Sequence, residues 1–232
     1  MPVISFASPK GGAGKTTAAL LLATELAHIN IGVTVIDCDP RQWCAKWGEG
    51  GQVPDAMTIE PKPNEEDILD AIERAKAKTP FVIVDLEGTN SMLVAYAISR
   101  SDLVIVPTQA GPMEGESAAD AIKLVKHQQK VFNRQIPFAV LMTRMSAVIR
   151  SKIEKDLAGQ MKEAAIPVFT TQLLERNAFK SIIAYRCPLW ALPKTTYKLE
   201  DAQKNARSFA GEVFAMFKAK KSETSVKEEA IA

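Results

Sequence analysis

Two lysines and three glycines stand close together near the start of the chain, in residues 8–17, SPKGGAGKTT. An apolar run precedes this segment and a helical pattern begins near Thr16. Strand, glycine-rich loop and helix form a phosphate-binding loop, whose backbone N–H groups and helix N-terminus surround a triphosphate. The spacing predicts that Lys15 reaches the β- and γ-phosphates and that the Thr16 hydroxyl ligates Mg²⁺. The residues expected to bind the nucleotide are Lys10, Gly11, Gly12, Ala13, Gly14, Lys15, Thr16 and Thr17, with Thr143 and Arg144 after a later strand.

The elements that must position this loop alternate between short β-rich runs and helical runs. Strands are predicted at residues 3–8, 33–37, 81–85, 103–107, 138–143 and 168–173. Helices are predicted at 16–29, around Trp43, and at 66–77, 91–99, 115–132, 147–165, 178–186 and 201–217, with a polar segment at 48–65. This alternation predicts a three-layer α/β fold, a mostly parallel twisted sheet with helices on both faces. We expect one domain over residues 1–217 and a polar, disordered tail over 218–232.

Acidic residues follow two of the predicted strands. In open α/β sheets the ligand lies at the carboxyl ends of the strands, so these residues are candidates for the site. Asp85 ends an apolar run and is placed as the carboxylate that holds Mg²⁺ through a bound water. Asp37 and Asp39 follow the second strand, where a carboxylate either acts beside the triphosphate or caps the next helix.

Composition excludes several classes of protein. The 232 residues are 47% hydrophobic and 24% charged, with a net charge of +2, so any contact with nucleic acid must come from local clusters of Lys and Arg. Cys38, Cys44 and Cys187 fit neither a disulfide framework nor a zinc site, which favours a reducing, cytoplasmic setting. No stretch approaches the ~18 apolar residues that span a bilayer.

The pattern from Lys10 to Thr16, K-G-G-x-G-K-T, resembles the deviant Walker A motif of the ParA/MinD family of ATPases. The resemblance covers residues 1 to about 217 and is strongest to the small plasmid-partition ParA proteins, including the ParF-like ones. Residues 37–40, D-C-D-P, are similar to the switch segment of that family. The resemblance implies that Lys10 crosses a dimer interface to the partner's nucleotide, that Asp39 positions the attacking water and that Asp37 supports the metal. The expected catalytic residues are thus Lys10, Lys15 and Asp39, and the expected metal site is formed by Thr16, Asp37 and Asp85.

Two positions depart from the family pattern. Asp85 is followed by Leu86-Glu87-Gly88, where the family usually has Asp-Thr and small or proline residues, and Arg41 replaces a common glutamine. Glu87 adds negative charge near a triphosphate. Three interpretations stay open for it: it turns outward, binds the partner subunit or alters the rate of hydrolysis.

The resemblance implies an ATP- and Mg²⁺-dependent switch for plasmid partition or cargo positioning. Its expected partners are a second copy of the chain when ATP is bound, DNA without sequence preference, and a ParB-like or cargo adaptor that stimulates slow hydrolysis. The expected location is cytoplasmic and nucleoid-associated. Phosphate contacts from basic side chains would give steep salt dependence. The candidates for these contacts are Arg150, Lys152, Lys155, Lys180, Arg186, Lys194 and Lys198, with Lys204 and Arg207 further along.

The same fold also serves different functions, and three of them stay open for this sequence. A MinD-like ATPase would cycle on a membrane through an apolar stripe near the C-terminus, although packing of that stripe against the core is favoured. The stripe consists of Phe209, Val213, Phe214, Met216 and Phe217. A relative that aids conjugative transfer or positions organelles is the second possibility, and a metabolic P-loop enzyme is the third. Trp43 and Trp47 are assigned either to the core or to a nucleotide-sensitive dimer contact.

Overall fold

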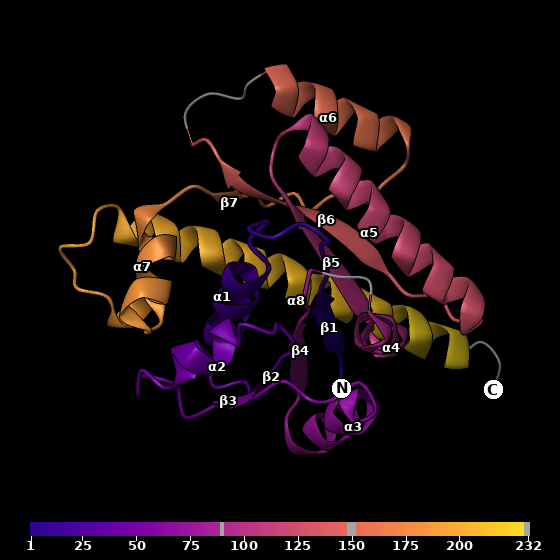
Figure 1. Cartoon of the computed structure of the whole chain (residues 1–232), viewed down its shortest axis with the longest axis horizontal. Coiled ribbons are helices and arrows are strands. Elements are labelled where there is room, and N and C mark those ends of the chain that lie inside the picture. The colour runs from indigo at the N-terminus through magenta and orange to yellow at the C-terminus, as the bar shows by residue number, and fades with distance from the viewer. Residues whose placement is uncertain (89–90, 148–151, 230–232) are drawn as a thin grey trace.

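A seven-stranded parallel sheet carries the residues of the predicted site (Figure 1). The structure is a computed structural model that describes residues 1–88, 91–147 and 152–229, with side chains up to residue 217. The strands are β1 (Val3–Phe6), β2 (Val33–Asp37), β3 (Met57–Glu60), β4 (Phe81–Asp85), β5 (Leu103–Thr108), β6 (Phe138–Met145) and β7 (Leu173–Leu174). Their order is β3-β2-β4-β1-β5-β6-β7, and every neighbouring pair is parallel. The predicted fold class is confirmed.

Helices cover both faces of the sheet and complete three layers. The helices are α1 (Lys15–His28), α2 (Trp43–Gly48), α3 (Ile68–Lys78), α4 (Met92–Arg100), α5 (Pro112–Val131), α6 (Lys152–Glu163), α7 (Asn177–Tyr185), the 3-10 helix η1 (Leu189–Ala191) and α8 (Leu199–Glu229). One apolar cluster joins α1, α2, α7 and α8 to the sheet, and a second joins α3 to α6 to its other face.

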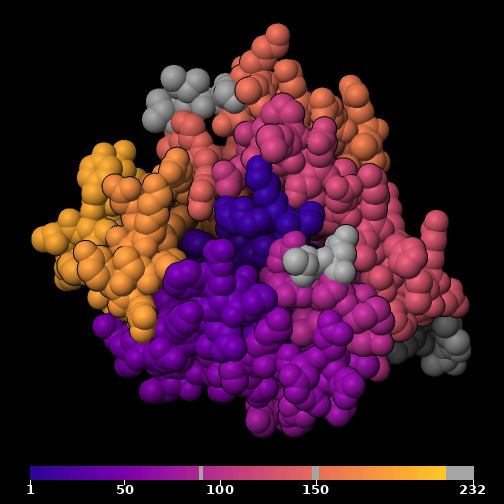
Figure 2. Space-filling view, in the orientation of Figure 1, coloured from indigo at the N-terminus to yellow at the C-terminus, as the bar shows by residue number. Residues whose placement is uncertain are grey.

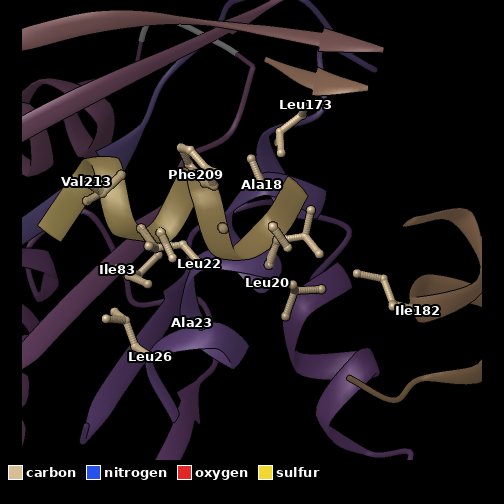
Figure 3. Close-up of a cluster of buried hydrophobic side chains, with 14 of the residues drawn as sticks. Ala18, Leu20, Leu22, Ala23, Leu26, Ile83, Leu173, Ile182, Phe209 and Val213 are labelled. Atoms are coloured by element: carbon tan, nitrogen blue, oxygen red, sulfur yellow. The ribbon is translucent and has the colours of Figure 1, made fainter. Parts of the chain in front are cut away.

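The strands are buried on both sides, and successive side chains enter opposite clusters. In β4, Val82 and Val84 belong to the cluster beneath α3 to α6, whereas Ile83 belongs to the cluster beneath α1 and α8. This is the period-two alternation of a strand, and burial of both faces explains why the strands are almost continuous apolar runs. Figure 3 shows Ile83 with Leu22 of α1 and Phe209 of α8 in the cluster beneath α1 and α8.

The chain direction places the carboxyl ends of three strands together. From β1 the chain moves outward to β2 and β3, returns to insert β4 between β2 and β1, and continues on the other side of β1 with β5. Asp85 is in register with Phe6 of β1 and with Asp37 of β2. A ligand is expected at such a reversal of strand order, outside the carboxyl ends of the strands.

Several predicted boundaries are wrong. β3 lies inside the segment 48–65, for which the sequence predicts a polar, irregular structure. β3 is an edge strand in which only Met57 is buried, so its apolar pattern is weak. The predicted strand at 168–173 is reduced to a single bridge at Val168 and to the two residues of β7. α5 begins at Pro112, because proline fits the first helical position without losing a hydrogen bond. Part of the helix predicted at 147–165 lies outside the described residues, and α6 begins at Lys152.

The last helix extends beyond its predicted end. α8 runs to Glu229, whereas the sequence predicts a helix over 201–217. The side chains from residue 218 onward lie outside those described, so the boundary at 217 and the disordered tail stay predictions.

Candidate nucleotide-binding site

The loop between β1 and α1 has the backbone shape that its glycines predict. Gly12 has φ +79° and Gly14 has φ +96°, in the left-handed region that side chains rarely adopt. A Cβ on Gly14 would also lie 3.5 Å from the Thr143 side chain. Figure 2 shows the N-terminal residues, coloured indigo, at the centre of the face in view, with later parts of the chain around them. Gly11 and Gly12 are exposed, so this part of the loop is open to solvent.

Lys15 opens α1 and points into this loop. Its Nζ atom donates to the Ser8 carbonyl at 3.0 Å and is 3.4 Å from the Lys10 carbonyl. The side chain is buried, and burial lowers the pKa of Lys15 although the charges of Asp85 and Asp39 act in the opposite direction. A buried ammonium whose hydrogen bonds within the described residues go to carbonyl groups gains strongly from an anionic ligand. This arrangement suits the predicted contact with phosphate.

Thr16 at the start of α1 and Asp85 at the end of β4 are in contact. The Thr16 hydroxyl donates to Asp85 Oδ2 at 2.7 Å, and the other carboxylate oxygen, Oδ1, is buried without a hydrogen-bond partner among the residues that the structure describes. No group of three or more His, Cys, Asp or Glu residues able to hold a metal occurs among the described residues. Mg²⁺ often keeps several waters and binds through one carboxylate and substrate phosphates. The orphaned oxygen beside a hydroxyl fits that mode of binding.

Burial raises the pKa of Asp85 to about 7, opposed by the hydrogen bond from Thr16. Because the folded pKa lies above the unfolded one, ionisation of Asp85 weakens the nucleotide-free fold as pH rises from about 4 to 7. Asp85→Asn removes this buried charge and is expected to raise the melting temperature by a few degrees at pH 8. The gain should shrink at pH 5, where the wild-type carboxyl is protonated. Thermal melts of both proteins at the two pH values measure it.

The same variant should lose the extra thermal stability that Mg²⁺ and a triphosphate give to the wild type. A variant that melts lower than the wild type at pH 8 would contradict a destabilising carboxylate. Retention of the full magnesium-dependent shift would contradict its place in the metal site.

Asp37 holds the loop that follows β2. Its two oxygens accept the backbone N–H groups of Asp39, at 3.1 Å, and of Ala45, at 2.9 Å. Burial raises the pKa of Asp37, and these backbone hydrogen bonds oppose the rise. Since Ala45 lies in the first turn of α2, Asp37 caps that helix, which is the capping role that its sequence position also allows. Its predicted metal role stays a prediction.

Asp39 faces the same edge but is less constrained. It is half-buried, and its Oδ1 atom accepts the Arg41 N–H at 2.8 Å. No hydrogen bond to its other carboxylate oxygen is found within residues 1–88, 91–147 and 152–229. Its charge acts on Lys15, which places it near the phosphate loop. The geometry is compatible with a group that orients water.

Lys10 is held within its own chain. Its Nζ atom forms an ion pair with Glu114, in the first turn of α5, and both side chains are partly exposed. The Lys10 ammonium holds the pKa of Glu114 below its ordinary value. A side chain at Gly111 would collide with the Glu114 carboxylate, so the glycine leaves space for this pair. No local pattern in the sequence points to Glu114, because 104 positions separate the two residues.

Glu87 is paired and largely buried. Its Oε2 atom lies 3.5 Å from Lys62 Nζ, and its side chain is 10% exposed. The first of the three interpretations, that Glu87 turns outward, does not fit this burial. The neighbouring Gly88 is packed closely, since a Cβ there would lie 3.2 Å from the Pro9 carbonyl and 3.7 Å from Lys15 Nζ.

Thr143 and Arg144 lie beside the loop, as predicted, but differ in role. Thr143 is buried and donates to the Ala13 carbonyl at 2.8 Å, fixing the back of the loop. Arg144 is exposed with φ +53° and lines a cavity of about 320 Å³ that begins at Gly14 and Thr17. The other lining residues are Thr143, Leu173, Leu174, Glu175, Arg176, Phe179, Lys180 and Ile183. This volume is at the lower end of the ~300–1,000 Å³ of small-molecule sites, and both apolar and charged groups line it.

Three further residues contribute to the site. Cys44 Sγ lies 3.5 Å from Asp85 Oδ2, and Glu114 holds Lys10. Gln109 Nε2 donates to the Gly12 carbonyl at 2.8 Å. Gln109 directly follows β5, and a position after a strand is a sequence signal for this site. Cys44 and Glu114 lie within helices, where no such signal points to them.

The predicted DNA-contacting residues fall into separate groups. Arg150 lies outside the described residues. Lys152 and Lys155 are exposed on α6, whereas Lys180, Arg186, Lys194 and Lys198 lie on α7 and in the segment before α8. α6 and α7 are well apart in Figure 1. Lys180 also pairs with Glu175 at 2.8 Å on the wall of the cavity.

The C-terminal apolar stripe packs against the core. Phe209 and Val213 are buried, and Phe214 and Phe217 pack around Phe81, with ring centroids 6.2 Å apart in each case. Met216 stays 37% exposed. Among the described residues, no helix combines the length and apolar character needed to cross a membrane. The favoured packing role of the stripe is confirmed.

The two tryptophans of α2 differ in burial. Trp47 is buried and donates from Nε1 to the Ile182 carbonyl at 2.8 Å, whereas Trp43 is 45% exposed, with Lys46 Nζ 5.4 Å from its ring centre. The core assignment holds for Trp47 but is wrong for Trp43.

Comparison with known proteins identifies the family. The VirC1 protein family matches residues 1–187. Protein ParA from Rhizobium radiobacter is 34% identical over 214 residues, covering 92% of this chain and 96% of that protein. Apo McdA from Cyanothece has a TM-score of 0.76 at 18% identity, with 92% of this chain and 99% of that chain covered. A putative plasmid partition protein from Borrelia burgdorferi B31, bound to AMPPNP, has a TM-score of 0.71 at 19% identity, with 93% and 99% covered.

The two solved structures show the shared fold, and the sequence matches extend over most of the chain. The chain therefore belongs to the VirC1 family and is a ParA-like member of the ParA/MinD group of P-loop proteins.

Proposed function

We propose that this protein is an ATP-dependent switch that dimerises with ATP and Mg²⁺, binds DNA without sequence preference and hydrolyses ATP slowly until a partner stimulates it. Its role would be partition of DNA or positioning of another cargo. The single observation that carries the proposal is the constellation at the loop: the Thr16 hydroxyl 2.7 Å from Asp85, an orphaned Asp85 oxygen, and the buried ammonium of Lys15. The ParA relative supports the biological role.

Each residue of the site would have a distinct role in ATP binding and hydrolysis. Lys15 and the backbone N–H groups of the loop would bind the phosphates and place the terminal phosphorus for in-line attack. Thr16 and Asp85 would hold Mg²⁺, which neutralises charge on the β- and γ-phosphate oxygens when bound. Asp39 would orient the attacking water, while Asp37 keeps the Asp39 loop in place through two backbone hydrogen bonds. The cavity beside Thr17 would hold the base.

The ion pair of Lys10 with Glu114 bears on dimerisation. If Lys10 contacts a nucleotide in the partner subunit, it must leave Glu114 first. The pair is partly exposed, so its opposition to dimer formation is small and a triphosphate can outcompete one carboxylate. Loss of the terminal phosphate would return Lys10 to Glu114 and favour separation of the subunits.

This arrangement predicts opposite effects for two variants. Lys10→Ala should abolish ATP-dependent dimerisation, because the contact across the interface is lost. Glu114→Gln should strengthen dimerisation by a few-fold, because Lys10 is released from its intramolecular partner. Analytical ultracentrifugation with a non-hydrolysable ATP analogue, with ADP and without nucleotide measures both. A monomeric wild type with the analogue, or a dimer of Lys10→Ala equal to that of the wild type, would refute the proposed use of Lys10.

The DNA-binding part is tested by co-sedimentation with DNA and with liposomes, at two salt concentrations. Salt-sensitive DNA binding by the wild type with ATP, and its loss in Lys10→Ala, are the expected results. Liposome binding by the wild type would instead favour a membrane-cycling protein, a function that the burial of Phe209 and Val213 does not support. Binding to neither DNA nor liposomes would favour the third possibility, a metabolic ATPase. Fluorescent fusions in cells then test the expected nucleoid association.

A further inference from the structure

A continuous stretch of the chain carries basic and aromatic residues but no acidic ones. Between Glu175 and Glu200 the sequence contains no Asp or Glu. Its cations are Arg176, Lys180, Arg186, Lys194 and Lys198, and its aromatic residues are Phe179, Tyr185, Trp190 and Tyr197. The stretch comprises α7, η1 and the segment that leads into α8. This combination is typical of surfaces that bind nucleic acid through both phosphate contacts and stacking.

The structure separates this stretch into an inner and an outer part. Phe179 and Ile183 of α7 line the cavity beside the phosphate loop. Tyr185 is two residues further along and therefore lies on another side of the helix, where it is 67% exposed. Tyr197 is 70% exposed. Both rings of this acid-free stretch are therefore available for stacking with a ligand.

The cations around these rings are available for a ligand. Lys198 Nζ lies 5.3 Å from the ring centre of Tyr197. Within the part of the chain that the structure describes, neither Lys194 nor Lys198 forms an ion pair. Arg186 approaches Glu49 at 3.8 Å, but both side chains are largely exposed, so this pair is weak.

An ion pair relates the positions of the two tyrosines to α7. Arg176, just before α7, pairs with Asp201 in the first turn of α8 at 3.6 Å. The start of α7 therefore lies beside the residues that follow Tyr197, whereas Tyr185 is the last residue of α7. A nine-residue helix is about 13 Å long, so Tyr185 and Tyr197 lie toward its opposite ends.

We propose that this surface, formed by Tyr185, Arg186, Lys194, Tyr197 and Lys198, binds single-stranded DNA by stacking of bases on the two tyrosines. In a duplex the bases are stacked on each other and their faces are not accessible, so the rings of the two tyrosines cannot stack on them. A single strand offers both phosphates and free base faces. The inference rests on the proposed DNA association and adds the class of DNA and the residues that select it.

The test measures fluorescence anisotropy of the full-length protein with a labelled oligothymidylate of about 20 nucleotides and with a duplex of equal length. We expect the wild type to bind the single strand more tightly than the duplex. The double variant Tyr185→Ala/Tyr197→Ala should lose single-strand affinity about tenfold or more, with little change for the duplex. Tyr185→Phe/Tyr197→Phe should keep the affinity, because phenylalanine still stacks. Lys194→Gln/Lys198→Gln should reduce the salt dependence for both DNAs.

One matched control lies on α5 and the other directly follows it, on the opposite side of Figure 1 from α7. Phe132→Ala removes an aromatic side chain that is 44% exposed, and Lys126→Gln removes an exposed lysine. Neither should alter single-strand binding. Equal binding of single strand and duplex, or equal loss in the alanine and phenylalanine pairs, would overturn the inference while leaving the proposed DNA association intact. Failure to bind either DNA with or without ATP would overturn both.

Discussion

Asp39→Asn is expected to slow ATP hydrolysis by about 10²–10⁴-fold while ATP binding and the ATP-bound dimer persist. Asparagine keeps the oxygen that accepts the Arg41 N–H, and the backbone N–H of residue 39 can still donate to Asp37. What the variant loses is the negative charge beside the attacking water. The measurement combines phosphate release, nucleotide binding and sedimentation on the same preparation. The expected result is a protein trapped as an ATP-bound dimer.

A control separates this effect from a general loss of charge. Asp55 is exposed between α2 and β3, and Asp55→Asn should leave hydrolysis unchanged. Hydrolysis by Asp39→Asn within a few-fold of the wild type would remove Asp39 from the catalytic role. Loss of ATP binding in that variant would assign Asp39 to the structure of the loop instead.

The second large effect is expected for Lys15→Ala, which should lower kcat/KM for ATP by at least ~10²-fold. The ammonium is buried beneath the loop, where it would contact phosphate oxygens in a setting of low dielectric. In the nucleotide-free protein its only hydrogen bonds within the described residues go to carbonyl oxygens. Steady-state kinetics and direct nucleotide binding measure the loss.

The stability of this variant distinguishes lost binding from misfolding. Burial lowers the pKa of Lys15, which means that its charge is unfavourable in the nucleotide-free fold. The melting temperature of Lys15→Ala without nucleotide should therefore stay within a few degrees of the wild type, while the stabilisation by ATP disappears. Lys126→Ala, at an exposed position of α5, should retain both. ATP-dependent stabilisation of Lys15→Ala equal to that of the wild type would contradict the assignment.

Local patterns predict the central part of the site well. The left-handed conformations at Gly12 and Gly14, the start of α1 and the position of Asp85 at the end of β4 all follow from short segments. The reason is that backbone conformation and strand burial are encoded within a few residues. Parallel strands then bring their carboxyl ends to one edge, so residues 37 and 85 could be expected to meet.

Weak local signals explain the errors. β3 is a four-residue edge strand with a single buried residue, and β7 has only two residues, so neither has a run of apolar side chains to mark it. Trp43 and Trp47 are one helical turn apart, yet only Trp47 finds a buried partner, the Ile182 carbonyl of α7. The packing of α2 against α7 decides this, and it is not visible in either segment alone.

The sequence by itself determined the phosphate loop, the acidic residues that face it and the parallel α/β sheet, because each depends on residues that are close in the chain. Only the tertiary structure decided that Glu114 holds Lys10 across 104 positions and that Cys44 contacts Asp85 across 41. It also decided that the apolar stripe of α8 faces the core and that Tyr185 and Tyr197 face solvent. These outcomes depend on the packing of helices onto the sheet, since contacts between distant segments form only when all of the layers are assembled.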